Sequence, residues 1–254
     1  MRKNSIGIVS GKGGVGKTTV TANLGVSLAK FFNVNTIVLD ANVLTSNLGL
    51  HLGFVREPVS LHDVLQNKLQ IDQVIYVHSS GLNVIPSSLA VDANVDVSAL
   101  GETIKYLEKS YDYVVVDSAP GLSKEALVVM GACDSFIVVT NPELPAVTDA
   151  IKTISVLEQM NKHILGIVLN KITGNKYELT RHHIERVTDY PVIAEIPFDE
   201  HVPASIAYKT PVVLYAPNCK ASVRLRGLAA WVCDKPYLEQ GESVWMRLFH
   251  LIFG

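Results

Sequence analysis

The stretch "SGKGGVGKTT", Ser10–Thr19, decides the fold of this chain. It contains the pattern G-x-x-x-x-G-K-[ST], in which a glycine-rich loop surrounds phosphate groups with its backbone N–H groups and a lysine contacts the β- and γ-phosphates. The pattern is completed by Gly11, Gly16, Lys17 and Thr18. The loop follows a short apolar run and precedes a helical pattern, as a phosphate loop does. The stretch therefore predicts a P-loop nucleotide site, with the Thr18 hydroxyl as a Mg²⁺ ligand.

The same stretch holds one lysine more than the pattern needs. Lys17 meets the requirement for phosphate contact, so Lys12 is available for another task. A lone lysine at a loop edge is most often a solvated side chain, and the pattern by itself leaves that alternative open.

Apolar runs of strand length alternate with helical patterns along the chain. Several runs are β-branched and bounded by turn residues, which is typical of buried strands. Alternation of strands and helices indicates right-handed βαβ units, and therefore an α/β fold with a mostly parallel sheet of about eight strands and helices on both faces. The expected strands are Ile6–Ser10, Thr36–Asp40, Leu82–Ser87, Tyr113–Asp117, Ser135–Thr140, Ile164–Asn170, Val192–Ile196 and Val212–Tyr215, and expected helices include Val97–Lys109 and Ala146–Met160.

Composition is consistent with one such domain. The chain has 254 residues, 48% of them hydrophobic and 18% charged, which suits a folded core over residues 1–235 followed by a tail over 236–254. A net charge of −2 gives no sign of a nucleic-acid-wrapping protein. Three cysteines without a C-x-x-C pair, and no recognisable export signal, indicate the cytosol.

Polar residues at the ends of three expected strands are candidates for the ion and the base. Asp117 and Asp40 each close an apolar strand and could hold Mg²⁺ or its water shell, although a lone strand-end Asp is more often a helix cap. Asn170 opens "NKIT", where guanine-binding proteins carry N-K-x-D. The carboxylate that accepts from guanine is missing, whereas the Asn170 amide can bond adenine, so ATP is expected rather than GTP. The alternative is that Asn170 only caps its strand.

The stretch "GKGGVGKTT" resembles the deviant Walker A motif of the MinD/ParA superfamily, K-G-G-x-G-K-[ST]. Further segments resemble MinD segments in the same order over almost the whole chain, and the likeness is greatest to archaeal-type MinD proteins. These segments are "VLDANVLTSNLGLHLG", "SLHDVL", "YVVVDSAPGL", "TNPELPAVTDA", "GIVLNKI" and "AEIPFDEHVPASIAYKTPVVLYAP". The resemblance implies a single P-loop ATPase domain that hydrolyses ATP with Mg²⁺.

The resemblance also implies roles for individual residues. Lys12 occupies the position of a signature lysine that reaches the partner's phosphates across an ATP-sandwiched homodimer, Asp117 begins a switch segment over 117–122, and "IPFD" forms the adenine-side loop. The catalytic candidates are Lys12, Lys17, Asp40, Asn42 and Asp117; the nucleotide-binding candidates are Gly11, Lys12, Gly13, Gly14, Val15, Gly16, Lys17, Thr18, Thr19, Asn170, Lys171, Pro197 and Asp199; and the metal candidates are Thr18, Asp40 and Asp117.

One position departs from the family pattern. MinD-like proteins usually carry D-x-D after the second strand, and this chain has Asp40-Ala41-Asn42. An asparagine can orient water by hydrogen bonding but cannot act as a general base. Slow ATP hydrolysis is therefore expected.

The tail "ESVWMRLFHLIFG", Glu242–Gly254, has a broad apolar face when placed on a helix. Thirteen residues rise only about 20 Å, less than the roughly 30 Å hydrocarbon core of a bilayer, so the helix would lie in the membrane interface. It resembles the C-terminal targeting helix of MinD proteins, and the alternative is a terminal helix docked on its own domain. The membrane candidates are Val244, Trp245, Leu248, Phe249, Leu251, Ile252 and Phe253.

Together these features predict an ATPase that forms an ATP-dependent homodimer and binds the inner face of the cell membrane. From the cytoplasm it would position the division site or a polar assembly through an unidentified regulatory or cargo protein. The alternatives are a ParA-like ATPase that partitions DNA, which the charge disfavours, and an ATP-clamped scaffold with very slow hydrolysis. Relatives that carry metal clusters usually show paired cysteines, and this chain has none.

Overall fold

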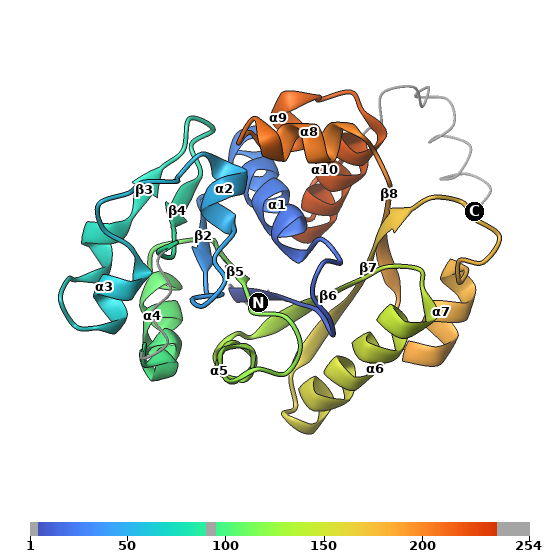
Figure 1. The fold of residues 1–254 in the computed structure, drawn as a ribbon, viewed down its shortest axis with the longest axis horizontal. Coiled ribbons are helices and arrows are strands. Elements are labelled where there is room, and N and C mark those ends of the chain that lie inside the picture. The colour runs from blue at the N-terminus through green and yellow to red at the C-terminus, as the bar shows by residue number, and fades with distance from the viewer. Residues whose placement is uncertain (1–4, 90–94, 238–254) are drawn as a thin grey trace.

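The computed structural model describes residues 5–89 and 95–237, and its centre is an eight-stranded sheet (Figure 1). The strand order is β3-β4-β2-β5-β1-β6-β7-β8, and neighbouring strands are parallel except for β3 and β4. The strands are β1 (Ser5–Val9), β2 (Thr36–Asp40), β3 (Tyr76–Val77), β4 (Asn83–Ile85), β5 (Tyr113–Asp117), β6 (Ser135–Thr140), β7 (His163–Ile172) and β8 (Val192–Pro197). The predicted α/β fold with helices on a mostly parallel sheet is confirmed.

Helices cover both faces of this sheet (Figure 1). One face carries α1 (Lys17–Phe32), α2 (Leu48–Leu52), α8 (His201–Ala207), α9 (Val212–Tyr215) and α10 (Lys220–Cys233). The other carries α3 (Leu61–Leu65), α4 (Leu100–Leu107), α5 (Lys124–Ala132), α6 (Leu144–Gln159) and α7 (Arg181–Thr188), with short 3-10 turns at Ile71–Val74 and Val97–Ala99.

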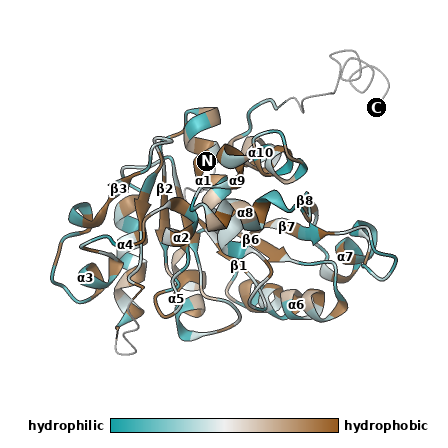
Figure 2. Ribbon diagram, turned by 45° about the horizontal axis from the view of Figure 1, so that its top comes forward, coloured by the Kyte–Doolittle hydropathy of each residue, from teal (hydrophilic) through white to brown (hydrophobic). Residues whose placement is uncertain are grey.

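The two helical layers explain why the central strands are apolar at nearly every position. In β5, Val114 and Val116 pack into the cluster under α4 and α5, whereas Val115 packs into the cluster under α1 and α10. Successive side chains of a strand point to opposite faces, so a strand covered on both sides must be apolar at every position. Figure 2 shows this as hydrophobic strands at the centre, with hydrophilic residues along α7.

One sequence prediction about the sheet is wrong, and one strand was not predicted. Val212–Tyr215 is the helix α9 and not a strand: it follows Pro211, and its two valines are buried in the cluster with α1 and α10. A four-residue apolar run cannot be distinguished from a buried helical turn by periodicity alone. The eighth strand is β3, a two-residue antiparallel edge strand that the apolar pattern did not reveal.

The carboxyl ends of the central strands place the expected site residues at one edge. The parallel register puts Asp40 at the end of β2 directly beside Asp117 at the end of β5, and β1 on the other side of β5 leads into the P-loop. In the part of the chain that the structure describes, no helix is long and apolar enough to cross a bilayer. The predicted helix over 242–254 lies outside the described residues.

Candidate functional site

The P-loop connects β1 to α1 by a backbone that only glycine can follow at key points. Gly16 is the N-cap of α1 and has φ 98°, and Gly14 has φ 80°. A Cβ added at Gly16 would lie 2.1 Å from Nδ2 of Asn170, and one at Gly11 would lie 2.2 Å from the backbone of Asp149. These glycines therefore let the loop approach β7 and α6 closely, in a conformation that side-chain-bearing residues rarely adopt.

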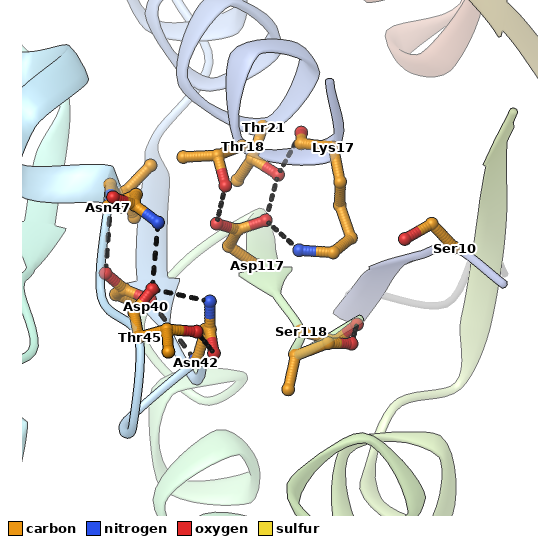
Figure 3. A network of polar contacts seen from close by, with 12 residues as sticks. Ser10, Lys17, Thr18, Thr21, Asp40, Asn42, Thr45, Asn47, Asp117 and Ser118 are labelled. Atoms are coloured by element: carbon orange, nitrogen blue, oxygen red, sulfur yellow. Dashed lines mark hydrogen bonds and ion pairs between the residues drawn. The ribbon is translucent and has the colours of Figure 1, made fainter. Parts of the chain in front are cut away.

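Three side chains on the first turns of α1 converge on Asp117 (Figure 3). Lys17 Nζ lies 3.2 Å from Oδ1, the Thr18 hydroxyl donates to Oδ2 at 2.7 Å, and the Thr21 hydroxyl donates to Oδ1 at 3.0 Å. Lys17 and Asp117 are both buried. The Lys17 ammonium is thereby held at the N-terminus of α1, where a helix also favours anions.

Asp40 is buried beside Asp117, and its carboxylate makes contacts of its own. It accepts hydrogen bonds from the Ser46 hydroxyl at 2.7 Å and from the backbone N–H groups of Leu48 and Asn42 at 3.1 and 3.2 Å. Burial, and next the charge of Asp117, raise the pKa of Asp40 from 3.8 to about 7. The structure therefore gives Asp40 a part in holding the segment 42–48; its part in metal binding stays a prediction.

The side chain of Asn42 is held at the edge of the cavity by Thr45. Its Nδ2 donates to the Thr45 carbonyl at 2.8 Å, and its Oδ1 accepts from the Thr45 hydroxyl at 2.9 Å. Both ends of the amide are therefore used within the loop that follows β2 (Figure 3). This reciprocal contact depends on an amide, because a carboxylate would face the Thr45 carbonyl without a proton to donate.

The end of β7 supports the P-loop from the other side. Asn170 Nδ2 donates to the Val15 carbonyl at 2.7 Å, and Lys171 Nζ donates to the Gly14 carbonyl at 2.7 Å. These bonds turn two loop carbonyls toward β7, which leaves the loop N–H groups for a ligand. The amide nitrogen that was predicted to bond adenine is thus engaged with the loop, although Asn170 still lines the cavity.

These elements surround a cavity of about 500 Å³, within the size range of small-molecule sites. Most nucleotide-binding candidates line it, whereas Gly11, Asp40 and Asp117 are not among its lining residues. One end is polar and formed by the P-loop, and the other is formed by the segment after β8 and by the first turns of α8. The lining residues include Lys12 to Thr19, Asn42, Asn170, Lys171, Ile196, Pro197, Phe198, Asp199, Val202, Pro203 and Ile206.

Lys12 and Lys17 occupy different places in this cavity. Lys12 lies at its rim, its side chain 38% exposed, with Nζ 3.7 Å from Oε2 of the exposed Glu143 just before α6. The Lys17 side chain is only 6% exposed. Lys17 is therefore buried at the polar end of the cavity, whereas Lys12 is partly exposed at its rim.

The residues present fit a magnesium nucleotide. Thr18 Oγ1 and Asp117 Oδ2 are 2.7 Å apart and provide the hard oxygen donors that Mg²⁺ prefers. Gly13 and Gly14 line the cavity and would meet no protein atom within 4 Å with an added Cβ, so the loop backbone is open to a ligand there, and the apolar end of the cavity is suited to a base. A bound magnesium ion would supply charge neutralisation between phosphate oxygens.

Several residues of the site were absent from the sequence prediction. Thr21 lies one turn beyond Thr18 on the same face of α1, so the i, i+3 spacing could have revealed it. Ser46 and Thr45 hold Asp40 and Asn42, but short polar residues in a loop carry no comparable pattern. His51 lines the cavity, and burial lowers the pKa of its imidazole.

Comparison with known proteins agrees with this geometry. A family model described as "ParA: NUBPL iron-transfer P-loop NTPase" matches residues 1–233. An uncharacterized ATP-binding protein of Methanocaldococcus jannaschii is 35% identical over 93% of this chain and 90% of its own length. The septum site-determining protein MinD of Thermotoga maritima is 30% identical over 89% of this chain and 86% of its own length.

Solved structures give the same result. The septum site-determining protein MinD of Pyrococcus horikoshii, complexed with Mg-ADP, superposes with a TM-score of 0.85 at 34% identity. The match covers 90% of this chain and 95% of that chain. The chain therefore belongs to the ParA/MinD family of P-loop ATPases.

Proposed function

We propose that this chain is a MinD-like ATPase that hydrolyses Mg·ATP and forms an ATP-sandwiched homodimer. The observation that carries the proposal is the separation of the two P-loop lysines, Lys17 buried against Asp117 and Lys12 at the exposed rim. Because Lys12 is exposed at the rim of the cavity, a second copy of the chain can reach it, whereas the buried Lys17 is out of reach. The Mg-ADP bound to the Pyrococcus relative supports the nucleotide and the ion.

Each side chain has a role that follows from its position. Lys17 and the P-loop N–H groups bind the phosphates, while Thr18 and Asp117 hold Mg²⁺ with Asp40 behind them. Asn42 orients the attacking water through the second N–H and the second lone pair that its amide keeps beyond the two bonds to Thr45. Pro197 and Asp199 border the base. Lys12 supplies positive charge to the partner's site, which stabilises charge in the transition state and makes dimerisation depend on ATP.

The assignment of the lysines is tested by comparing Lys12→Ala with Lys17→Ala. Lys12→Ala should bind a nucleotide analogue with nearly unchanged affinity but lose the ATP-induced dimer and hydrolysis. Lys17→Ala should weaken nucleotide binding about 10- to 100-fold, which corresponds to the roughly 1.5–3 kcal/mol of a hydrogen bond to a charged group. Light scattering with a non-hydrolysable ATP analogue measures the dimer, and phosphate release measures turnover.

Lys105→Ala is a matched control, because Lys105 is another exposed lysine paired with surface carboxylates, on α4. It should dimerise and hydrolyse ATP as the unaltered chain does. A Lys12→Ala protein that also dimerises and hydrolyses ATP normally would refute the role of Lys12.

We further propose that a domain over residues 1–235 is followed by a tail whose helix over 242–254 binds the cytoplasmic face of the membrane in the ATP dimer. The dimer would then position the division site or a polar assembly by binding a regulatory or cargo protein. Two linked helices bind more tightly than one, by about 10²-fold or more, because the second binding event is intramolecular. This avidity would make membrane residence a readout of ATP.

Sedimentation with phosphatidylcholine vesicles containing phosphatidylglycerol tests the tail. The full chain should sediment in ATP and much less in ADP, while a truncation before Glu242 and the variant Phe249→Glu should stay in the supernatant in both. Equal sedimentation of the full chain and the truncation in ATP would reject membrane binding by the tail.

A further inference from the structure

Three side chains at the end of the cavity that the segment after β8 forms carry donor atoms of the kinds that bind zinc. Asp199 follows β8, His201 is the first residue of α8, and Cys219 is the N-cap of α10. One ligand atom of each, a carboxylate oxygen, an imidazole nitrogen and a sulfur, lies within 4.8 Å of the others. We propose that Asp199, His201 and Cys219 form a binding site for a borderline-soft divalent metal ion such as Zn²⁺.

The distances suit such an ion after a small adjustment. Tetrahedral zinc with O, N and S ligands places ligand atoms roughly 3.5 Å apart. Asp199 Oδ1 and His201 Nδ1 are 2.7 Å apart, and the His201 side chain is 57% exposed. A modest rotation of this exposed imidazole therefore opens the space for an ion between the three donors.

The surrounding contacts orient the other two donors as outer-shell partners of a metal site do. Asp199 Oδ2 accepts from the Ala221 N–H at 3.3 Å, which leaves Oδ1 facing His201. Cys219 Sγ lies 3.2 Å from the Ser222 hydroxyl and accepts from the Ser222 N–H at 3.4 Å. Both residues are thus fixed by the first turn of α10, a fourteen-residue helix.

The surroundings of Asp199 favour its ionised form as a ligand, whereas those of Cys219 oppose the thiolate until an ion binds. Burial opposes the charge of Asp199, but hydrogen bonds from the His201 side chain and from the N–H groups of His201 and Ala221 lower its pKa from 3.8 to about 2. Burial raises the pKa of the Cys219 thiol. Binding of the ion would release the thiol proton to solvent and leave a thiolate ligand.

The donor set separates this site from the magnesium site. Mg²⁺ prefers oxygen ligands and near-octahedral geometry, whereas a sulfur and an imidazole favour Zn²⁺ or Co²⁺. Three protein ligands leave one tetrahedral position for water. The ion would join the start of α8 to the start of α10, two elements that lie side by side at the base end of the cavity (Figure 1).

Cobalt titration of the reduced, nucleotide-free full chain tests the proposal, because only a thiolate ligand gives sulfur-to-cobalt charge-transfer absorption in the near ultraviolet. One Co²⁺ per chain should produce the band, Zn²⁺ should displace it, and excess Mg²⁺ should leave it intact. Cys219→Ser, which keeps a favoured N-cap residue, should abolish the band. His201→Gln should weaken Co²⁺ binding at least tenfold.

Cys233→Ser and His182→Gln are the matched controls, since they remove a thiol at the end of α10 and an exposed imidazole on α7. Both should titrate as the unaltered chain does. Absence of the band from the unaltered chain, or its persistence in Cys219→Ser, would overturn the proposal. Circular dichroism of each variant establishes that it is folded.

Discussion

Lys12 and Lys17 lie in one loop, and the fold gives them opposite surroundings. Lys17 is buried in an ion pair with Asp117, and removal of one partner from such a pair leaves an uncompensated buried charge. Lys12 has only a loose contact with an exposed carboxylate, Glu143. Exposed pairs of this kind contribute little to stability, so Lys12 is free to exchange its partner at little cost.

Exchange of the Asn42 amide for a carboxylate should change both ATP hydrolysis and stability. Asn42→Asp should raise steady-state ATP hydrolysis by about tenfold or more, because a carboxylate can position and polarise water in a way that an amide cannot. The same change should lower the stability of the nucleotide-free protein by about 1–3 kcal/mol, because it removes the donor to the Thr45 carbonyl and adds charge beside Asp40. Phosphate release and denaturant unfolding measure the two effects.

An unchanged hydrolysis rate in Asn42→Asp would contradict the view that this position slows turnover. Thr45→Val is a useful companion, since it removes the Thr45 hydroxyl but keeps the carbonyl that accepts from Asn42. It should lower stability without raising the rate.

Motif spacing was enough to predict some contacts of the site and not others. Lys17, Thr18 and Asp117 could be placed together because a P-loop and the end of a neighbouring parallel strand meet at one edge of a sheet. The partner of Asn170 could not be predicted, because it is a backbone carbonyl 155 positions away that any residue at Val15 would provide. The same holds for Lys171 and the Gly14 carbonyl.

At the scale of elements, long apolar strands were predictable and short ones were not. A central strand such as β5 or β6 is apolar at nearly every position because helices cover both sheet faces. The edge strand β3 has only two residues, one of them exposed, and leaves no periodic signal. In α9 the β-branched composition favoured a strand, but packing of Val212 and Val213 against α1 and α10 decided for a helix.

The adjacent ends of β2 and β5 lead to a prediction about pH. The pKa of Asp40 is raised from 3.8 to about 7 by burial and by Asp117, so the folded protein holds this proton more tightly than the unfolded chain does. The resulting stabilisation is present below pH 3.8 and is lost as pH rises through about 7. The nucleotide-free protein should therefore lose stability, relative to Asp40→Asn, between about pH 4 and about pH 7.

The loss in the free energy of unfolding is expected to be on the order of a few kcal/mol. It is measured by comparing how the free energy of unfolding changes with pH in the unaltered protein and in Asp40→Asn. Guanidinium unfolding of both proteins at several pH values, with a chelator present, provides it. Titrating groups that do not interact with Asp40 are common to both proteins and cancel in the difference, whereas its neighbour Asp117 is part of the measured effect. Parallel stability curves would show that Asp40 does not carry this proton.

At the scale of the whole molecule, one ligand site joins elements from both halves of the chain. The cavity is bounded by the P-loop and α1, by the loop after β2, by the end of β7 and by the segment after β8. Mg·ADP at about 100 times its dissociation constant should therefore stabilise the protein by about 2.7 kcal/mol, which corresponds to a melting temperature about 5–10 °C higher. At the same ligand concentration, Lys17→Ala, with binding weakened about 10- to 100-fold, should lose about half or more of this shift, and Lys105→Ala should keep it.

Calorimetry with and without Mg·ADP provides this measurement. A shift of equal size in Lys17→Ala would mean that the ligand binds away from the P-loop. An equal rise in melting temperature without Mg²⁺ would instead mean that nucleotide binding does not depend on an ion held by the Thr18 and Asp117 oxygens.

The bonds from Asn170 and Lys171 to the P-loop carbonyls also have a consequence for the timing of a reaction cycle. Because the bonds to β7 already order the loop in the folded chain, nucleotide binding does not bear the entropy cost of ordering this backbone. Arriving nucleotide meets a loop that is already shaped, and its capture rate should rise linearly with concentration, without a slow ordering phase. In the proposed cycle the slow steps are then hydrolysis, release of product and the encounter between two copies of the chain.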